Sequence, residues 1–154
     1  DWLQGEGGRD VLLPGGGGAH CAGTVEGGPG SDRIVIAQQG DNDVFGGTER
    51  DTIDLRNAPQ GMYVDLASGH FWSLGSPPIG SLVFETENVL GSDWPDEIYG
   101  NGRPNRLFGF DGSDTIHGRG GNDYLDGGAG IGDLLYGDSG FDTCVDGETE
   151  ICEG

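Results

Sequence analysis

The feature that most constrains this chain is a nine-residue period that begins at Gly91. Read in nines from there, the sequence gives GSDWPDEIY, GNGRPNRLF, GFDGSDTIH and GRGGNDYLD, followed by the ten-residue GGAGIGDLLY and by GDSGFDTCV. Every unit opens with Gly, carries Asp or Asn near its sixth position, and has an aliphatic residue or Cys two places later. Consecutive units in this register predict a solenoid of short turns and strands.

A less regular version of the same pattern precedes residue 56. An acidic residue stands two places before an apolar one in GEGGRDVLL, GGPGSDRIV, the stretched QQGDNDVF and GGTERDTID. These segments give the pairs Asp10/Leu12, Asp32/Ile34, Asp43/Phe45 and Asp51/Ile53. We expect irregular repeats over this part of the chain.

Residues 56–90 abandon the period. MYVDLAS, GHFWSL and SLVFETENVL are typical of two or three ordinary strands, with turn signals at Ser68-Gly69 and Ser76-Pro77-Pro78. We therefore expect one domain, 1–154, in four parts: irregular repeats over 5–55, a β-strand insertion over 56–90, a regular nonapeptide roll over 91–145, and a disulfide-closed cap over 146–154.

The repeat also predicts how the chain is coiled. The first six residues of a unit form a turn, in which Gly reaches positive φ without steric cost, and the last three form a strand whose middle residue points inward. Two units make one coil, so turns on one side stack at a spacing of about 4.8 Å. The predicted fold is an all-β, right-handed parallel β-roll, with Asp96, Asp114 and Asp133 in one column and Asn105, Asp123 and Asp142 in the other.

The composition indicates that such a roll cannot be held by apolar packing alone. Gly accounts for 34 of the 154 residues, and apolar residues make up only 33%. The formal net charge of -20 argues against nucleic acid and anionic membranes as partners. Since no apolar run approaches the roughly 18 residues of a spanning helix, we expect no membrane insertion.

Stacked carboxylates repel one another unless a cation lies between them. Calcium fits, because it takes about 6 to 8 oxygen ligands at about 2.3 to 2.6 Å and the turns offer backbone carbonyls beside the carboxylates. Zinc prefers Cys and His, and magnesium requires a tighter octahedron. We therefore predict several Ca2+ ions and a chain that is largely unfolded without them, because metal binding supplies the folding free energy.

The three cysteines indicate an oxidising compartment. Cys144 and Cys152 flank a short loop, as a disulfide that staples a chain end would, and Cys21 is left either free or paired with another chain. The first residues lack the charged start and apolar stretch of a signal peptide, so any such signal would already have been removed. We expect a secreted, extracellular protein.

The units GFDGSDTIH and GRGGNDYLD resemble the RTX, or haemolysin-type, calcium-binding repeat, and DTIDL, YVDLASG and ENVLGS resemble the C-terminal domain of serralysin-type metalloproteases. In a stacked pair, the resemblance implies that the earlier turn gives its second and fourth carbonyls and the later turn its first and third, each with its Asp. The implied ligand groups are Ser92, Trp94 and Asp96 with Gly109, Asp111 and Asp114; Phe110, Gly112 and Asp114 with Gly127, Ala129 and Asp133; Arg119, Gly121 and Asp123 with Gly137, Ser139 and Asp142; Asn105 with Gly118, Gly120 and Asp123; and Gly28, Gly30 and Asp32 with Gly46, Thr48 and Asp51.

Three features depart from the family pattern. Asn105 replaces the usual Asp in a turn that contains Pro104, which predicts a weak or empty site. The extra residue around Gly132 is expected to shift the register of Asp133. The cysteine-closed end differs from the cysteine-poor C-terminal secretion signal of many members, which favours export by an N-terminal signal.

No residue pattern predicts catalysis, and we expect a binding and structural module rather than an enzyme. Gly137-Asp138-Ser139-Gly140 spells the nucleophile motif of trypsin-like proteases but falls in register with the repeat. There is no HExxH, and the histidines lie far apart at His20, His70 and His117, the last expected to be solvated. The aromatic residues of the insertion are expected to pack a satellite core: Phe71, Trp72 and Phe84.

The leading hypothesis is an extracellular calcium-binding β-roll module whose folding is driven by Ca2+. One alternative is a subunit of a calcium-stabilised extracellular fibre or surface assembly, because solenoid ends expose strand edges that could self-associate. Another is an accessory domain processed from a secreted hydrolase.

Overall fold

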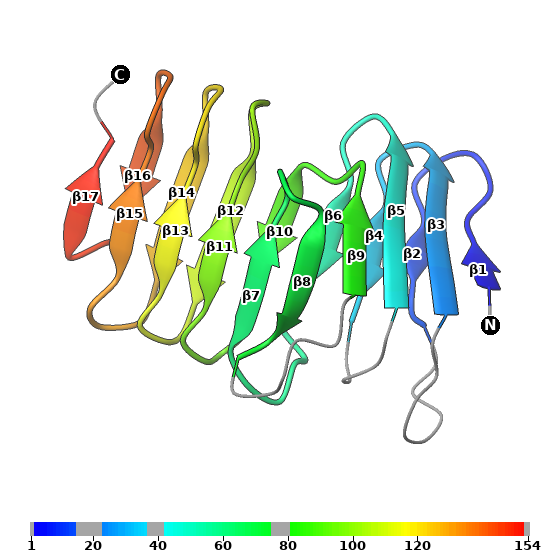
Figure 1. The fold of residues 1–154 in the computed structure, drawn as a ribbon, viewed down its shortest axis with the longest axis horizontal. Helices are drawn as coiled ribbons and strands as arrows, with labels where there is room; N and C mark the ends of the chain where they lie inside the picture. The colour runs from blue at the N-terminus through cyan, green and yellow to red at the C-terminus, as the bar shows by residue number, and fades with distance from the viewer. Residues whose placement is uncertain (1, 15–22, 37–41, 75–80, 153–154) are drawn as a thin grey trace.

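The computed structural model describes residues 2–14, 23–36, 42–74 and 81–152, which contain strands and no helix. Figure 1 shows two sheets that face each other. In both, the strands follow one another along the long axis of the molecule, with the N-terminal strands at one end and the C-terminal strands at the other. The ten-stranded sheet has the order β1-β3-β5-β9-β8-β7-β11-β13-β15-β17, and the seven-stranded sheet the order β2-β4-β6-β10-β12-β14-β16. This is the predicted all-β parallel roll.

The strands are short. Those of the ten-stranded sheet are β1 (Trp2–Gln4), β3 (Gly23–Pro29), β5 (Asn42–Thr48), β7 (Met62–Asp65), β8 (His70–Ser73), β9 (Ser81–Phe84), β11 (Glu97–Tyr99), β13 (Thr115–His117), β15 (Leu134–Tyr136) and β17 (Thr149–Ile151). Those of the seven-stranded sheet are β2 (Val11–Leu12), β4 (Arg33–Val35), β6 (Thr52–Asp54), β10 (Asn88–Leu90), β12 (Arg106–Phe110), β14 (Tyr124–Gly128) and β16 (Thr143–Val145).

The core lies between the sheets and consists mainly of the middle residues of the strands, as predicted. From β10 onward, six of these residues have no exposed surface: Ile98, Ile116 and Leu135 in the ten-stranded sheet, and Val89, Leu107 and Leu125 in the other. The ten-residue unit keeps this register, since Ile116 pairs with Leu135. Its extra residue is absorbed within the turn, where Gly132 has a φ of 89°, so the expected shift of Asp133 does not occur.

One pair predicted in the N-terminal repeats is wrong. Val44, not Phe45, is the inward residue of β5, and it pairs with Val25 of β3. Asp43 takes no part in a column, because its Oδ1 accepts the backbone N–H of Leu82 at 3.2 Å. The segment QQGDNDVF lacks the six-residue Gly turn, so the spacing rule of the regular units fails there.

The insertion joins the two blocks of repeats instead of forming a separate layer. β8 runs antiparallel to β7 and β9, whereas β7 is parallel to β11 and β9 is parallel to β5. Phe71 is 2% exposed and belongs to the common core, so the predicted satellite core is wrong. Trp72 instead stacks on Tyr63, with ring centroids 4.0 Å apart, and Phe84 is exposed beside Phe45.

The predicted turn at Ser68-Gly69 follows β7, where Asp65 Oδ1 accepts the backbone N–H of Ser68 at 3.0 Å. The turn signal Ser76-Pro77-Pro78 lies outside the described residues, as do His20 and Cys21.

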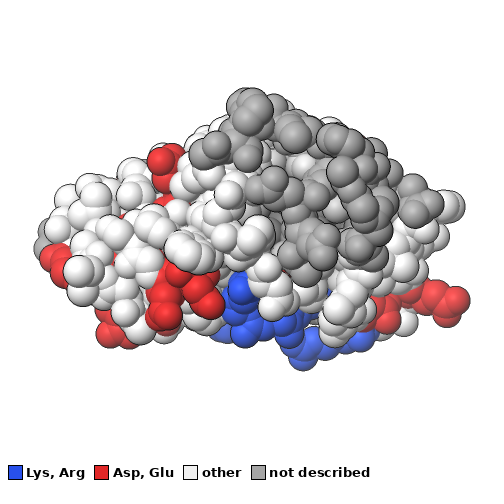
Figure 2. Space-filling view, turned by 90° about the horizontal axis from the view of Figure 1, so that it is seen from below, with Lys and Arg blue, Asp and Glu red and all other residues white. Residues whose placement is uncertain are grey.

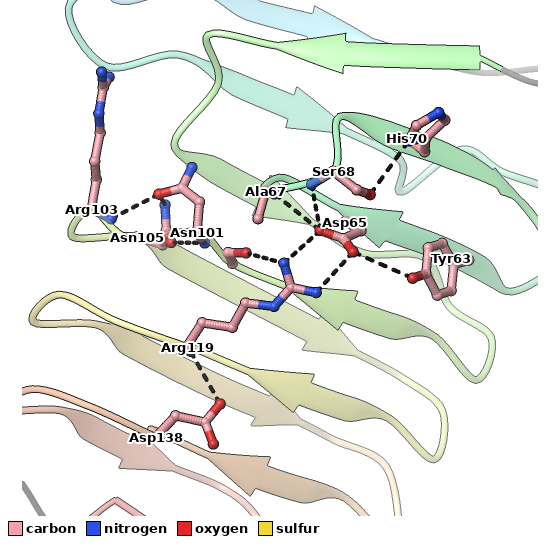
Figure 3. A network of polar contacts seen from close by, with 11 residues as sticks. Tyr63, Asp65, Ala67, Ser68, His70, Asn101, Arg103, Asn105, Arg119 and Asp138 are labelled. Atoms are coloured by element: carbon pink, nitrogen blue, oxygen red, sulfur yellow. Dashed lines mark hydrogen bonds and ion pairs between the residues drawn. The ribbon is translucent and has the colours of Figure 1, made fainter.

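Arg119 ties the insertion to the regular roll (Figure 3). Its Nη1 and Nη2 donate to the two carboxylate oxygens of Asp65 at 2.7 and 2.8 Å, and its guanidinium lies 5.2 Å from the centroid of the Tyr99 ring. Burial alone would raise the pKa of the Asp65 carboxyl, but the hydrogen bonds from Arg119 hold this pKa below its ordinary value. A bidentate pair of this kind fixes the insertion against the coils that follow it.

His117 is not simply solvated. Its ring is half-buried in a row of stacked rings, 5.1 Å from Tyr99 and 4.5 Å from Tyr136 between centroids. The row arises because Tyr99, His117 and Tyr136 are the last residues of β11, β13 and β15 and lie in register on the outward side of the sheet.

The C-terminal cap is closed by the predicted disulfide between Cys144 and Cys152. β17 pairs in parallel with β15 and adds the last strand of the ten-stranded sheet. The segment that joins β16 to β17 lies inside the disulfide loop.

Candidate metal centres

Two rows of acidic side chains follow the turns of the roll and are linked by one recurring hydrogen bond. Along most of each row, Oδ1 of an Asp accepts the backbone N–H of the row residue one coil earlier, at 2.7 to 2.8 Å. The short row consists of Asp96, Asp114, Asp133 and Glu148. The long row consists of Asp10, Asp32, Asp51, Glu87, Asn105, Asp123 and Asp142. The structure therefore aligns the residues of each of the two columns expected from the nine-residue period.

The second carboxylate oxygen has no hydrogen-bond partner in most of these side chains. Among the described residues, Oδ2 is buried and unpartnered in Asp10, Asp32, Asp51, Asp114, Asp123, Asp133 and Asp142. A buried carboxylate oxygen without a partner is strongly unfavourable, by several kcal/mol per uncompensated charge. Rows of such oxygens at equivalent places in successive coils are what bound cations would stabilise.

Six of the seven unpartnered oxygens, all but that of Asp142, lie beside a backbone carbonyl of the next coil, and we call the small space that the two oxygens border a cradle. A Cβ added to Gly109 would lie 2.7 Å from the Gly127 carbonyl oxygen and would clash with Oδ2 of Asp114. At Gly118 the corresponding carbonyl is that of Gly137. Glycine opens each of these turns because a side chain would fill the cradle.

The backbone of the turns places further carbonyls near the rows. The second and fourth residues of a turn are left-handed, as in Phe110 and Gly112, with φ of 78° and 144°. The carbonyls of Phe110 and Gly112 accept the backbone N–H of Ala129 and Ile131 at 2.8 and 3.2 Å. A carbonyl has two lone pairs, so each retains one for another partner.

The other predicted ligand groups lie in comparable register. In the long row, Ser139 exchanges backbone hydrogen bonds with the turn one coil earlier, donating to Arg119 and accepting from Gly121, both at 3.0 Å. In the N-terminal part, Gly30 donates to the Thr48 carbonyl at 3.4 Å. The structure thus stacks the turns that the resemblance pairs.

The two turns that contain proline differ from the rest. In the turn before Pro95, both oxygens of Asp96 are already satisfied: Oδ1 accepts the Ser92 hydroxyl and the Met62 N–H at 2.8 and 2.6 Å, and Oδ2 accepts the Ser92 N–H at 2.6 Å. The Trp94 carbonyl accepts the Ser92 hydroxyl at 3.2 Å. A residue before proline is restricted to extended conformations, so these turns lack the left-handed fourth residue.

Asn105 lies in the second proline turn and is also fully paired. Its Oδ1 accepts the Asn101 N–H at 2.9 Å, and its Nδ2 donates to the Glu87 carbonyl at 2.8 Å. An amide NH2 cannot bind a cation, so the donor set at Asn105 is poorer than in an Asp turn.

Burial shifts the acid equilibria of the rows. Desolvation raises the pKa of the Asp114 carboxyl from 3.8 to about 7, with a further contribution from the charges of Asp96 and Asp133. Desolvation likewise raises the pKa of Asp51, Asp96 and Asp123 to about 6. The metal-free roll therefore holds these carboxylates under electrostatic strain.

The donor set fits calcium. Nowhere in the described ranges do three or more His, Cys, Asp or Glu side chains converge as a cluster that could hold a metal ion. The cradles instead offer one or two carboxylates together with backbone carbonyls. Such an all-oxygen set of flexible geometry is what Ca2+ accepts.

Sequence reasoning missed three members of the rows as site residues: Asp10, Glu87 and Glu148. Asp10 belongs to an Asp/apolar pair, but no ligand group was assigned to it. Glu87 stands two places before the buried Val89, the same spacing with Glu in place of Asp, and this signal could have identified it. Glu148 has no such signal, because Glu150 follows two places later.

Positive and negative charge are segregated on the surface. On the face shown in Figure 2, the arginines gather in one patch with acidic groups on either side of it. Arg33 and Arg106 lie in the same outward row of the seven-stranded sheet, and Arg33 and Arg56 both pair with the buried Asp54. In the part of the chain that the structure describes, no helix is long and apolar enough to cross a membrane.

The protease-like motif Gly137-Asp138-Ser139-Gly140 is an ordinary turn of the roll. Asp138 has a φ of 65°, its carboxylate accepts the Arg119 N–H at 3.2 Å, and Ser139 pairs with Gly120 in a parallel bridge. These residues occupy positions of the nine-residue repeat.

Comparison with known families agrees with this geometry. The family model described as the RTX calcium-binding nonapeptide repeat matches in four copies, over residues 1–18, 23–53 and 99–134. The search of curated proteins found no match. With repeats matched over more than half of its length and folded as a parallel β-roll, the chain belongs to the family of RTX calcium-binding repeat proteins.

Proposed function

We propose that this chain is an extracellular calcium-binding β-roll module whose folding is completed by Ca2+ ions bound along its two rows. The observation that carries the proposal is the set of buried Oδ2 atoms that have no partner among the described residues and recur at equivalent places. Seven such charged oxygens in one small domain are unfavourable unless cations balance them.

Three stacked pairs of turns have the most complete donor sets. They are centred on Asp32 with Asp51, Asp114 with Asp133, and Asp123 with Asp142. In each, Oδ1 of the later Asp is held by a backbone N–H, which fixes the carboxylate, while Oδ2 stays available. Bound calcium supplies positive charge and an oxygen-coordinating centre between two coils.

The proline turns are proposed as the weakest places for an ion. The paired oxygens of Asp96 and the amide of Asn105 would have to give up protein hydrogen bonds before they could bind calcium. We therefore propose that the group with Ser92, Trp94 and Asp96, and the group with Asn105, are held by the protein itself.

Secretion is supported by the disulfide. A Cys144–Cys152 bond persists in oxidising compartments and is rare in reducing ones. Extracellular calcium, often bound by modules with Kd of about 10⁻⁴ to 10⁻³ M, would then be available to the rows.

Calcium titration of the metal-free protein, followed by circular dichroism and isothermal calorimetry, tests the proposal. We expect binding of several ions together with a gain of β signal, and weaker binding in the Asp123→Asn variant. Glu97→Gln is the matched control, because Glu97 is exposed and outside both rows. An unchanged β signal in excess chelator would refute calcium-driven folding, and the absence of any binding at millimolar calcium would refute the function itself.

A further inference from the structure

A three-residue turn in the C-terminal loop has the donors of a repeat turn without the repeat sequence. Residues 146–148 lie between β16 and β17, inside the loop closed by the Cys144–Cys152 disulfide. Oε2 of Glu148 accepts the backbone N–H of Asp133 at 2.7 Å, as Oδ1 of Asp133 accepts that of Asp114 at 2.8 Å. Glu148 thus takes the place of the next Asp in the short row.

Asp146 supplies the carbonyl that a repeat turn would supply. A Cβ added to Gly127 would clash with the Asp146 carbonyl oxygen and would lie 3.0 Å from Oδ2 of Asp133. In the preceding coil, the same place beside Gly109 is bounded by the carbonyl of Gly127. Asp146 reaches this position with a φ of 54°, in the left-handed region that Asp adopts more readily than most residues.

Asp133 provides an independent sign of a ligand. It is 1% exposed, and its Oδ2 lies in the cradle with no hydrogen-bond partner. Oε2 of Glu148 accepts the N–H of the same Asp133, so a second carboxylate lies beside this cradle.

The turn at residues 85–87 has the same construction but a different counter-charge. Glu85 has a φ of 53°, its carbonyl oxygen borders the cradle beside Gly46, and Glu87 Oε2 accepts the Asp51 N–H at 3.1 Å. There the Arg103 guanidinium lies 3.3 Å from Glu87 Oε1. Glu148 has no arginine or histidine partner in the described ranges, so its turn is the one of the two without a side-chain counter-charge.

We propose that residues 146–148 complete an additional calcium site at the end of the short row, formed by Asp133 Oδ2, the Asp146 carbonyl and the Glu148 carboxylate. The inference rests on the proposed function, since the same ion would fill the repeat turns. It assigns a role to the disulfide as well, because the bond between Cys144 and Cys152 holds both new donors in one short loop.

The test is the number of calcium ions bound by the full chain, measured by isothermal calorimetry and native mass spectrometry. Glu148→Gln keeps the length of the side chain and its hydrogen bond to Asp133 but removes the charge, and we expect it to bind one ion fewer than the unaltered protein. Glu97→Gln, the exposed control with the same change of charge, should bind the full number. Equal numbers and affinities in both variants would overturn the inference.

Two further results keep this test separate from that of the proposed function. If the unaltered protein binds no calcium, the function fails; if it binds calcium and Glu148→Gln binds as many ions, only the additional site fails. Should Glu148→Gln not fold, anomalous scattering from calcium-soaked crystals of the unaltered protein decides. A peak between Asp133 and Glu148 supports the site, and peaks along the long row without one there would refute it.

Discussion

Replacing Asp114 by Asn should change stability in opposite directions with and without calcium. Asp114 has no exposed surface; its Oδ1 accepts the Asp96 N–H at 2.8 Å, and its Oδ2 has no partner. Asn has the same shape, keeps the first hydrogen bond, and places an uncharged NH2 group on the side of the Gly127 carbonyl, to which it can donate. In the metal-free protein the substitution therefore removes an unfavourable buried charge.

The size of the effect follows from the pKa of Asp114, which burial raises from 3.8 to about 7. At about 1.4 kcal/mol per pKa unit, ionisation at pH 8 costs the metal-free fold about 4 kcal/mol before solvent screening. We expect solvent screening to reduce this cost of ionisation by roughly half, so Asp114→Asn should stabilise the metal-free protein by about 2 kcal/mol. In saturating calcium, weakening one site roughly 100-fold removes about 2.7 kcal/mol of the stabilisation by calcium. This loss exceeds the gain of about 2 kcal/mol in the metal-free fold, so the variant should be less stable than the unaltered protein by roughly 0.5 to 1 kcal/mol.

Urea unfolding followed by circular dichroism, in calcium-free buffer and in excess calcium at pH 8, measures both effects. Glu97→Gln is the control with the same change of charge, because Glu97 is exposed and outside both rows, and it should change neither value by much. A metal-free Asp114→Asn variant less stable than the unaltered protein would show that Oδ2 is not under electrostatic strain. A variant that keeps the full stabilisation by calcium would show that Asp114 is not a ligand.

Three other perturbations have defined outcomes. The folded-state pKa values of Asp51, Asp96, Asp114 and Asp123 are raised to about 6 or 7, so the metal-free roll gains stability as these carboxyls bind protons. Its urea midpoint should therefore increase as the pH is lowered from 8 to 5, and its calcium affinity should decrease. A urea midpoint that decreases over this range would contradict the assignment. Arg119→Lys cannot make the bidentate pair with Asp65 and should lower the free energy of unfolding by about 1 to 2 kcal/mol, with the number of bound calcium ions unchanged by calorimetry. Replacing Cys144 and Cys152 by Ser should cost about 2 to 3 kcal/mol in urea unfolding under oxidising conditions, and no difference would show that the loop is already fixed without the bond.

The nine-residue period predicted much of the fold because one geometric unit repeats. Once a turn of fixed length and a three-residue strand are assigned, the inward residue and the stacked Asp follow for every coil, as Ile116 and Asp114 show. The prediction failed where the unit changes length, at Asp43, since a slip of one residue exchanges the inward and outward faces.

Other parts of the structure depend on contacts between segments that are distant in sequence. The antiparallel placement of β8 between β7 and β9 has no local signal that separates it from an ordinary hairpin. The pairing of Asp96 depends on Ser92 and on the N–H of Met62 from the insertion. Glu148 enters the short row 15 residues after Asp133, a spacing that no repeat unit has.

The two rows have unequal lengths, and this gives the molecule a direction. Among the described residues, the long row extends from Asp10 to Asp142, whereas the short row begins only at Asp96. Removal of calcium would therefore leave uncompensated negative charge along the long row alone in the N-terminal coils, and along both rows in the C-terminal coils. Unfolding should begin at the C-terminal coils and stop at the apolar strands of the insertion. The roll should therefore unfold from one end as the calcium concentration falls.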